Sequence, residues 1–78
     1  MKVHENVRRI RKSKGITQVF VAESLGIPVQ TYNGYELGRR NMKVEMIAKL
    51  SKILDEPIEN FFDQKIYESK NEKSREVS

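Results

Sequence analysis

Closely spaced glycines divide the first half of this chain into short segments, and that division restricts the possible folds more than any other feature. Gly15, Gly26 and Gly38 each stand where a helical apolar repeat breaks, as residues that end helices tend to do. The segments between them have apolar residues at helical spacing, and no stretch has the alternating pattern of a strand. The sequence therefore predicts an all-α fold made of short helices.

Capping residues and apolar spacing predict five helices. The second is expected to run from its cap Thr17 to Leu25, and the third, starting at Pro28, to span about 28–37. The first helix is expected to turn Val3, Val7 and Ile10 inward. The fourth, at about 43–54, has Val44, Ile47, Leu50, Ser51 and Leu54 on its expected inner side. The fifth, at about 57–68, has Ile58, Phe61 and Phe62 there.

The length of 78 residues suits one small domain. A chain of this mass buries roughly 60% of its surface, which supports a core but not a deep substrate cavity. We expect the domain to cover residues 1–68. Residues 69–78 have Val77 as their only apolar side chain, and we expect them to form a flexible tail.

Most catalytic and metal chemistry lacks its residues here. With no cysteine there is no disulfide, thiolate zinc site, iron–sulfur cluster or thiol nucleophile. His4 is the single histidine, and it is expected to lie at the surface near Arg11. We therefore expect no catalytic residue, metal or cofactor, and no enzyme activity.

The longest apolar run has only four residues, 19–22, which is too short for a transmembrane helix or a signal-peptide core. We expect a cytoplasmic protein. Its charge is unevenly distributed, because residues 1–43 carry nine Lys or Arg against three acids, whereas residues 44–68 carry three against six. A basic half beside an acidic half favours one surface that meets a polyanion, although uneven charge is also common on ordinary solvated surfaces.

The second and third helices form a helix-turn-helix pattern, and the residues around it carry a resemblance. Gly15-Ile16-Thr17-Gln18, Val21-Ala22, Leu25-Gly26-Ile27 and Glu36-x-Gly38-x-Arg40 resemble the phage lambda repressor and Cro-like helix-turn-helix family. The similarity covers about residues 5–62. It implies a compact five-helix DNA-binding domain, encoded by a bacterium or phage and associated with the nucleoid.

The third helix has one core face and one face that is polar but uncharged. Helix geometry places Tyr32 and Tyr35 on the first face. The other face suits base reading, because amides bind adenine edges and valine contacts a thymine methyl. The family's base-reading positions correspond here to Val29, Gln30, Asn33 and Gly34. Gly34 either lets the backbone approach DNA or reads nothing.

Phosphate contacts are expected beside these residues. Gln18, with Thr17, begins a helix whose free N–H groups attract phosphate, and the resemblance implies a backbone-contacting glutamine there. The alternative is a solvated first-turn residue. Arg39, Arg40 and Lys43 follow the third helix and are expected to position the protein without encoding sequence.

The resemblance also implies a structural ion pair between Arg11 and Glu36. Two residues depart from the family pattern: Tyr32 replaces a common aliphatic core residue, and Phe20 stands where a polar side chain is usual. Phe20 either fills a groove beside the first helix or contacts another protein.

Proteins of this kind bind two half-sites as symmetric dimers. The fifth helix is the expected interface, with Ile58, Phe62 and Ile66 nearest the partner, unless these residues only cap the core. The expected function is a sequence-specific double-stranded DNA-binding transcriptional regulator that represses at a palindromic operator as a homodimer. The alternatives are an antitoxin or restriction–modification controller of its own operon, with a toxin or anti-repressor as possible partner, or a protein–protein adaptor that keeps the fold.

Overall fold

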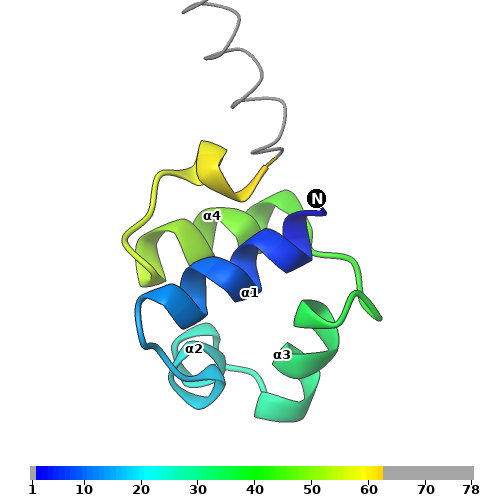
Figure 1. The fold of residues 1–78 in the computed structure, drawn as a ribbon. Coiled ribbons are helices and arrows are strands. Elements are labelled where there is room, and N and C mark those ends of the chain that lie inside the picture. The colour runs from blue at the N-terminus through cyan, green and yellow to red at the C-terminus, as the bar shows by residue number, and fades with distance from the viewer. Residues whose placement is uncertain (1, 63–78) are drawn as a thin grey trace, which may run out of the picture.

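The computed structural model describes residues 2–62, which form four α-helices and a short 3₁₀ helix. These are α1 (Val3–Ser13), α2 (Gln18–Leu25), α3 (Val29–Glu36), α4 (Val44–Ile53) and η1 (Ile58–Phe61). α2 packs on α3 and α4, while η1 packs on α1 and α4. Figure 1 shows α2 and α3 together at one end of the molecule and η1 at the other, with α1 and α4 between them. No helix among residues 2–62 is long and apolar enough to cross a membrane.

The turn between α2 and α3 follows from two local signals in the sequence. The Thr17 hydroxyl oxygen accepts a hydrogen bond from the Phe20 N–H at 3.0 Å and caps α2 as predicted. At the other end of α2, Gly26 has a φ of 74°, in the left-handed region that favours glycine. Ile27 N–H then bonds to the Ala22 carbonyl at 3.0 Å. These ends fix the direction in which α3 leaves α2.

The core lies where the four α-helices and η1 meet. Its buried apolar residues are Val7, Ile10, Val21, Ala22, Tyr32, Ile47, Leu50, Leu54 and Phe61. The prediction that Val44 faces inward is wrong, since this side chain is 69% exposed. Val44 is the first residue of α4, and helix side chains tilt toward the N-terminus, so it projects past the end of the helix.

A fifth α-helix is not present in the part of its range that the structure describes. Ile58–Phe61 is a single 3₁₀ turn, and Phe62 is extended with φ −91° and ψ −162°. The buried Asn6 amide bonds to the carbonyls of Phe61 and Phe62, which are the groups a continuing helix would use. The rest of the predicted helix, the residue Ile66 and the predicted tail 69–78 lie outside the described residues.

His4, predicted to lie at the surface, is half-buried. It lies against the loop that follows α3, where Gly38 has a φ of 82°. A Cβ added at Gly38 would lie 2.7 Å from His4 Nε2, whereas one at Gly26 would meet nothing within 4 Å. Gly38 therefore serves both a left-handed turn and a close approach to α1.

Gly38→Ala is expected to cost more than Gly26→Ala, because only the former must also displace the His4 ring. Both variants pay about 1–2 kcal/mol for left-handed backbone, and overpacking adds about 1 kcal/mol or more at Gly38. Chemical denaturation measures both losses. In a His4→Ala background the difference should disappear, and equal losses in the native background would contradict this account.

Candidate nucleic-acid interface

The exposed side of α3 holds the residues predicted to read bases. Tyr32 and Glu36 are buried one helical turn apart, which turns the opposite side outward. Gln30 on that side is exposed and Val29 is 37% exposed. Asn33 and Gly34 are half-buried. The burial of Tyr32 agrees with the predicted core face, whereas Tyr35, predicted on the same face, is only half-buried, like Asn33 and Gly34 on the other.

Gly34 lies beside the side chain of Arg40. A Cβ added at Gly34 would lie 3.7 Å from Arg40 Cδ and 3.8 Å from Arg40 Nε. The stem of Arg40 therefore packs along α3, and a methyl group at position 34 would make ordinary van der Waals contact with it. An arginine of the loop thus lies next to Gly34 on α3.

A buried carboxylate behind this surface receives four hydrogen bonds. Glu36 is 2% exposed, and its Oε2 accepts from Arg11 Nε at 2.7 Å and from Tyr32 Oη at 2.5 Å. Its Oε1 accepts from Arg11 Nη2 at 3.1 Å and from Gln18 Nε2 at 2.9 Å. Arg11 also donates through Nη1 to the Ile16 carbonyl at 2.7 Å. The Glu36 carboxylate of α3 is thus hydrogen-bonded to Arg11 of α1 and to Gln18 of α2, and it connects the three helices.

These contacts shift the pKa values of two buried groups in opposite directions. Burial by itself would raise the pKa of Glu36, but the hydrogen bonds from Arg11, Tyr32 and Gln18 outweigh it and hold the pKa below its ordinary 4.5. Burial, together with the hydrogen bond to the ionised Glu36, raises the pKa of Tyr32 far above its ordinary 10.0. At neutral pH, Glu36 is therefore an acceptor only and Tyr32 a donor.

Gln18 links this cluster to the outward side of α3. Its Nε2 donates to Glu36 Oε1 at 2.9 Å and to Asn33 Oδ1 at 3.1 Å. Both N–H bonds of the Gln18 side chain are thus used within the protein. A reversed amide would put the Gln18 oxygen against a carboxylate, so the charge on Glu36 fixes its orientation. The Asn33 oxygen faces Gln18, and the Asn33 NH₂ is the group left to donate outward.

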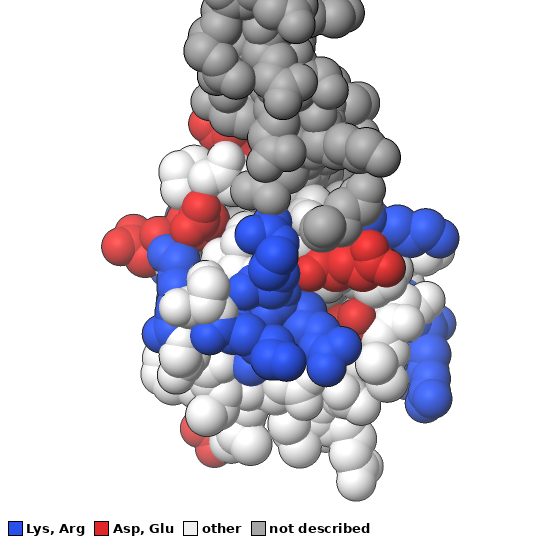
Figure 2. Space-filling model, viewed as in Figure 1, with Lys and Arg blue, Asp and Glu red and all other residues white. Residues whose placement is uncertain are grey.

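The predicted phosphate contacts lie around α3. Thr17 is exposed at the start of α2, and Arg39, Arg40 and Lys43 are exposed in the segment between α3 and α4. Figure 2 shows a further group of basic side chains gathered over α1.

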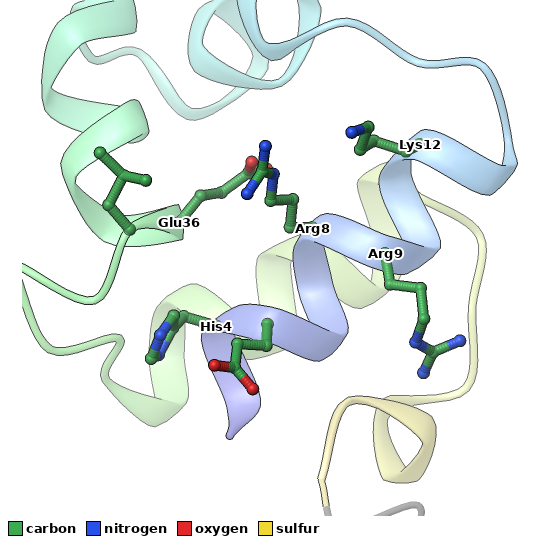
Figure 3. Close-up of a pocket in the computed structure, with 7 residues that line it drawn as sticks. His4, Arg8, Arg9, Lys12 and Glu36 are labelled. Carbon is green, nitrogen blue, oxygen red and sulfur yellow. The ribbon is translucent and has the colours of Figure 1, made fainter. Parts of the chain in front are cut away.

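The basic residues Arg8, Arg9 and Lys12 are exposed on α1. With His4, Glu5, Glu36 and Leu37 they line a hollow of about 550 Å³ between α1 and the end of α3 (Figure 3). The spacing of four residues between His4, Arg8 and Lys12 is the signal that could have placed them on one side of the helix.

The other predicted contact residues are placed as follows. Ile58 packs against the core and Phe62 is 40% exposed. Phe20 does not fill a groove, because it is 51% exposed on α2, next to the equally exposed Val19.

Among the described residues, no group of three or more His, Cys, Asp or Glu is arranged to hold a metal ion.

Comparisons with known proteins agree with this arrangement. A helix-turn-helix family model matches residues 7–61. The HTH-type transcriptional regulator YqaE of Bacillus subtilis is 41% identical over 51 residues, which are 65% of this chain and 44% of that protein. The SPbeta prophage-derived HTH-type transcriptional regulator YonR of the same organism is 40% identical over 50 residues, 64% of this chain and 46% of that protein. The chain thus spans less than half the length of these relatives. No solved structure matches it.

Proposed function

The chain belongs to the lambda repressor/Cro-like family of DNA-binding helix-turn-helix transcriptional regulators, and on that premise we propose that it binds double-stranded DNA sequence-specifically through α3. We propose further that it represses transcription at a palindromic operator as a homodimer. Its proposed setting is the bacterial nucleoid, whether the gene is bacterial or phage-derived like that of YonR.

The observation that carries this proposal is the outward side of α3 with its basic flank. Gln30 and Asn33 offer amide groups without a charge of their own, and Val29 offers an apolar contact for a thymine methyl. Arg39 and Lys43 stand in the next segment, where they suit phosphates. A helix face meant only for solvent is usually richer in lysine and glutamate.

The experiment that tests the proposal is selection of bound sequences from a randomised duplex pool at near-physiological salt. A homodimer should enrich an inverted repeat whose half-sites are centred about one helical turn apart. The proposal fails if the bound fraction keeps the composition of the input pool.

Gln30→Ala is expected to cost about 1–3 kcal/mol of binding free energy on the selected operator and little on random DNA, because a base contact is lost. Titration of the variant against both duplexes measures the two losses. Equal losses on both would remove Gln30 from the set of base-reading residues.

Arg40→Ala is expected to weaken binding to both DNAs, because a phosphate contact does not depend on sequence. The slope of log K against log salt should become shallower by about 0.9. Since Arg40 packs along α3 at Gly34, a loss confined to the operator would instead assign Arg40 to base reading.

The proposed dimer uses the segment that begins at η1. Phe62 is 40% exposed directly after η1, and η1 lies on the far side of α1 and α4 from α2 and α3 (Figure 1), which supports a contact that leaves the DNA-facing helices free. Sedimentation of the native chain and of Phe62→Asp measures this directly. The variant should become monomeric, and an unchanged mass would exclude Phe62 from the interface.

A role with a second protein is favoured by one observation. Val19 and Phe20 are each 51% exposed on neighbouring positions of α2. This supports the alternatives of an antitoxin, a restriction–modification controller or an adaptor that keeps the fold. An adaptor would show no sequence enrichment in the selection, whereas an antitoxin or a controller would bind the DNA of its own operon.

A further inference from the structure

We infer that one side of α1, formed by His4, Arg8 and Lys12, is a second contact to the DNA backbone, which binds phosphates flanking the bases read by α3. We call these three residues the α1 basic face. The inference rests on the proposed function, because its ligand is the phosphodiester backbone of the same duplex. It enlarges the contact from the helix-turn-helix unit to the first helix of the chain.

The geometry of the α1 basic face suits a phosphate group. Its three residues follow one another at intervals of four, which places them along one side of α1. The exposed Arg8 and Lys12 line the hollow of about 550 Å³ with Leu37, at the end of α3. Figure 3 shows Arg8 reaching from α1 toward Glu36. An anion bound in the hollow would therefore contact side chains of α1 and lie next to the end of α3.

The α1 basic face is continuous with the predicted phosphate contacts of the next segment. His4 lies directly against Gly38, which precedes Arg39 and Arg40. A second depression is lined by His4, Gly38 and Arg40, together with Lys2, Val3, Asn41 and Met42. Phosphates follow one another along a duplex at intervals of only a few ångströms. A strand that meets Arg39 and Arg40 can therefore continue past His4 to Arg8.

The charges in the hollow favour an anion although two carboxylates line it. Glu36 is already bound by Arg11, Tyr32 and Gln18, so its charge is compensated within the protein. Glu5 is then the acid that opposes Arg8 and Lys12. Within residues 2–62, neither Arg8 nor Lys12 forms a salt bridge with an acidic residue. Their charges are available to a ligand.

The test compares salt slopes for variants that each remove one positive charge. Arg8→Gln and Lys12→Gln are measured singly and together on the selected operator, with Lys52→Gln on the exposed side of α4 as the matched control. Each α1 variant should reduce the slope of log K against log salt by about 0.9, and the double variant by about 1.8. Lys52→Gln should leave the slope unchanged. The selected sequence should stay the same in all four variants.

Two results would overturn the inference. One is an unchanged slope for the double variant. The other is an equal reduction in Lys52→Gln, which would indicate only the net charge of the protein. Native chain that enriches no sequence and shows no salt-dependent binding would instead refute the proposed function itself, so the two failures are distinguishable. If the double variant keeps its DNA slope but loses an acidic protein partner in a pull-down, the α1 basic face belongs to that partner.

Discussion

Replacing Arg11 by methionine is expected to lower the free energy of unfolding by about 3–5 kcal/mol at neutral pH, the cost of leaving a buried charge without its partner. Glu36, which is 2% exposed in the native chain, would keep only the neutral donors Tyr32 and Gln18. For a domain of this size the loss is comparable to the whole stability of the fold. Urea denaturation followed by far-UV circular dichroism measures it.

The double variant Arg11→Met, Glu36→Gln is the control. It removes both charges, and the amide oxygen at position 36 can still accept from Gln18 while its NH₂ donates to the Tyr32 hydroxyl oxygen. It should recover most of the lost stability, because buried ion pairs contribute little beyond compensating each other's desolvation. If the double variant is as unstable as Arg11→Met alone, the packing of the Arg11 stem and not its charge is what the fold requires.

The stability that Glu36 contributes to the fold depends on pH. The folded pKa of Glu36 lies below its ordinary 4.5, so its contribution to stability is present above pH 4.5 and is lost as the pH falls toward the folded pKa. In Arg11→Met the strongest cause of that lowering is gone, and burial then favours the protonated carboxyl. The difference in stability between the native chain and the variant should therefore begin to shrink above pH 4.5, where the carboxyl of the variant takes up its proton, and should go on shrinking as the pH falls toward the folded pKa of the native chain. A constant difference from pH 7 to pH 3 would show that Glu36 is not the group responsible.

The features of this fold that could be predicted from the sequence are those that depend on residues close together in the chain. Thr17 caps α2 through a bond to Phe20, three residues away, and Gly26 ends the same helix in a left-handed turn. Both depend on the chain within one helical turn. The spacing of Ile47, Leu50 and Leu54 likewise predicts their burial. Val44 follows the same spacing and is exposed, because periodicity gives the side of a helix but not how far the core extends along it.

The parts that sequence reasoning missed depend on contacts between distant residues. Gln18 meets Asn33 and Glu36, 15 and 18 residues away, and this contact decides which atoms of Gln18 remain for DNA. Nothing in the spacing of α2 reports it. His4 and Gly38 are still farther apart in sequence, and their contact is what brings the α1 basic face next to the loop after α3. A site assembled from three helices is visible only once their packing is known.

The largest omission is Asn6, a fully buried polar residue that no motif singled out. Its Nδ2 donates to the Phe61 carbonyl at 3.0 Å and to the Phe62 carbonyl at 2.9 Å, 55 and 56 residues away. Position 6 lies beside the apolar stripe of α1, where an asparagine looks like an ordinary solvent-facing residue. These two bonds attach η1 to α1 and occupy the carbonyls where a fifth helix was predicted.

Asn6→Asp is accordingly expected to destabilise the protein by about 3 kcal/mol or more at neutral pH, although it changes the volume of the side chain very little. A carboxylate has no N–H to donate, and it would face two carbonyl oxygens in a site that excludes water. Burial and the two carbonyl oxygens favour the protonated acid, opposed by the Arg9 guanidinium 3.5 Å from the other oxygen, so the penalty should be largest at neutral pH and should decrease as acid protonates the group. Denaturation at pH 7 and at pH 4 measures both effects.

Asn41→Asp is the matched control for this prediction, because it makes the same chemical change at an exposed asparagine. It should alter the free energy of unfolding by no more than about 0.5 kcal/mol. Similar losses in the two variants would mean that added negative charge, and not the pair of bonds to η1, is what the protein fails to tolerate. A large loss confined to Asn6→Asp, relieved at low pH, would instead make Asn6 the residue that ends the helical path at Phe61. The attachment of η1 to α1 would then depend on a single amide of α1.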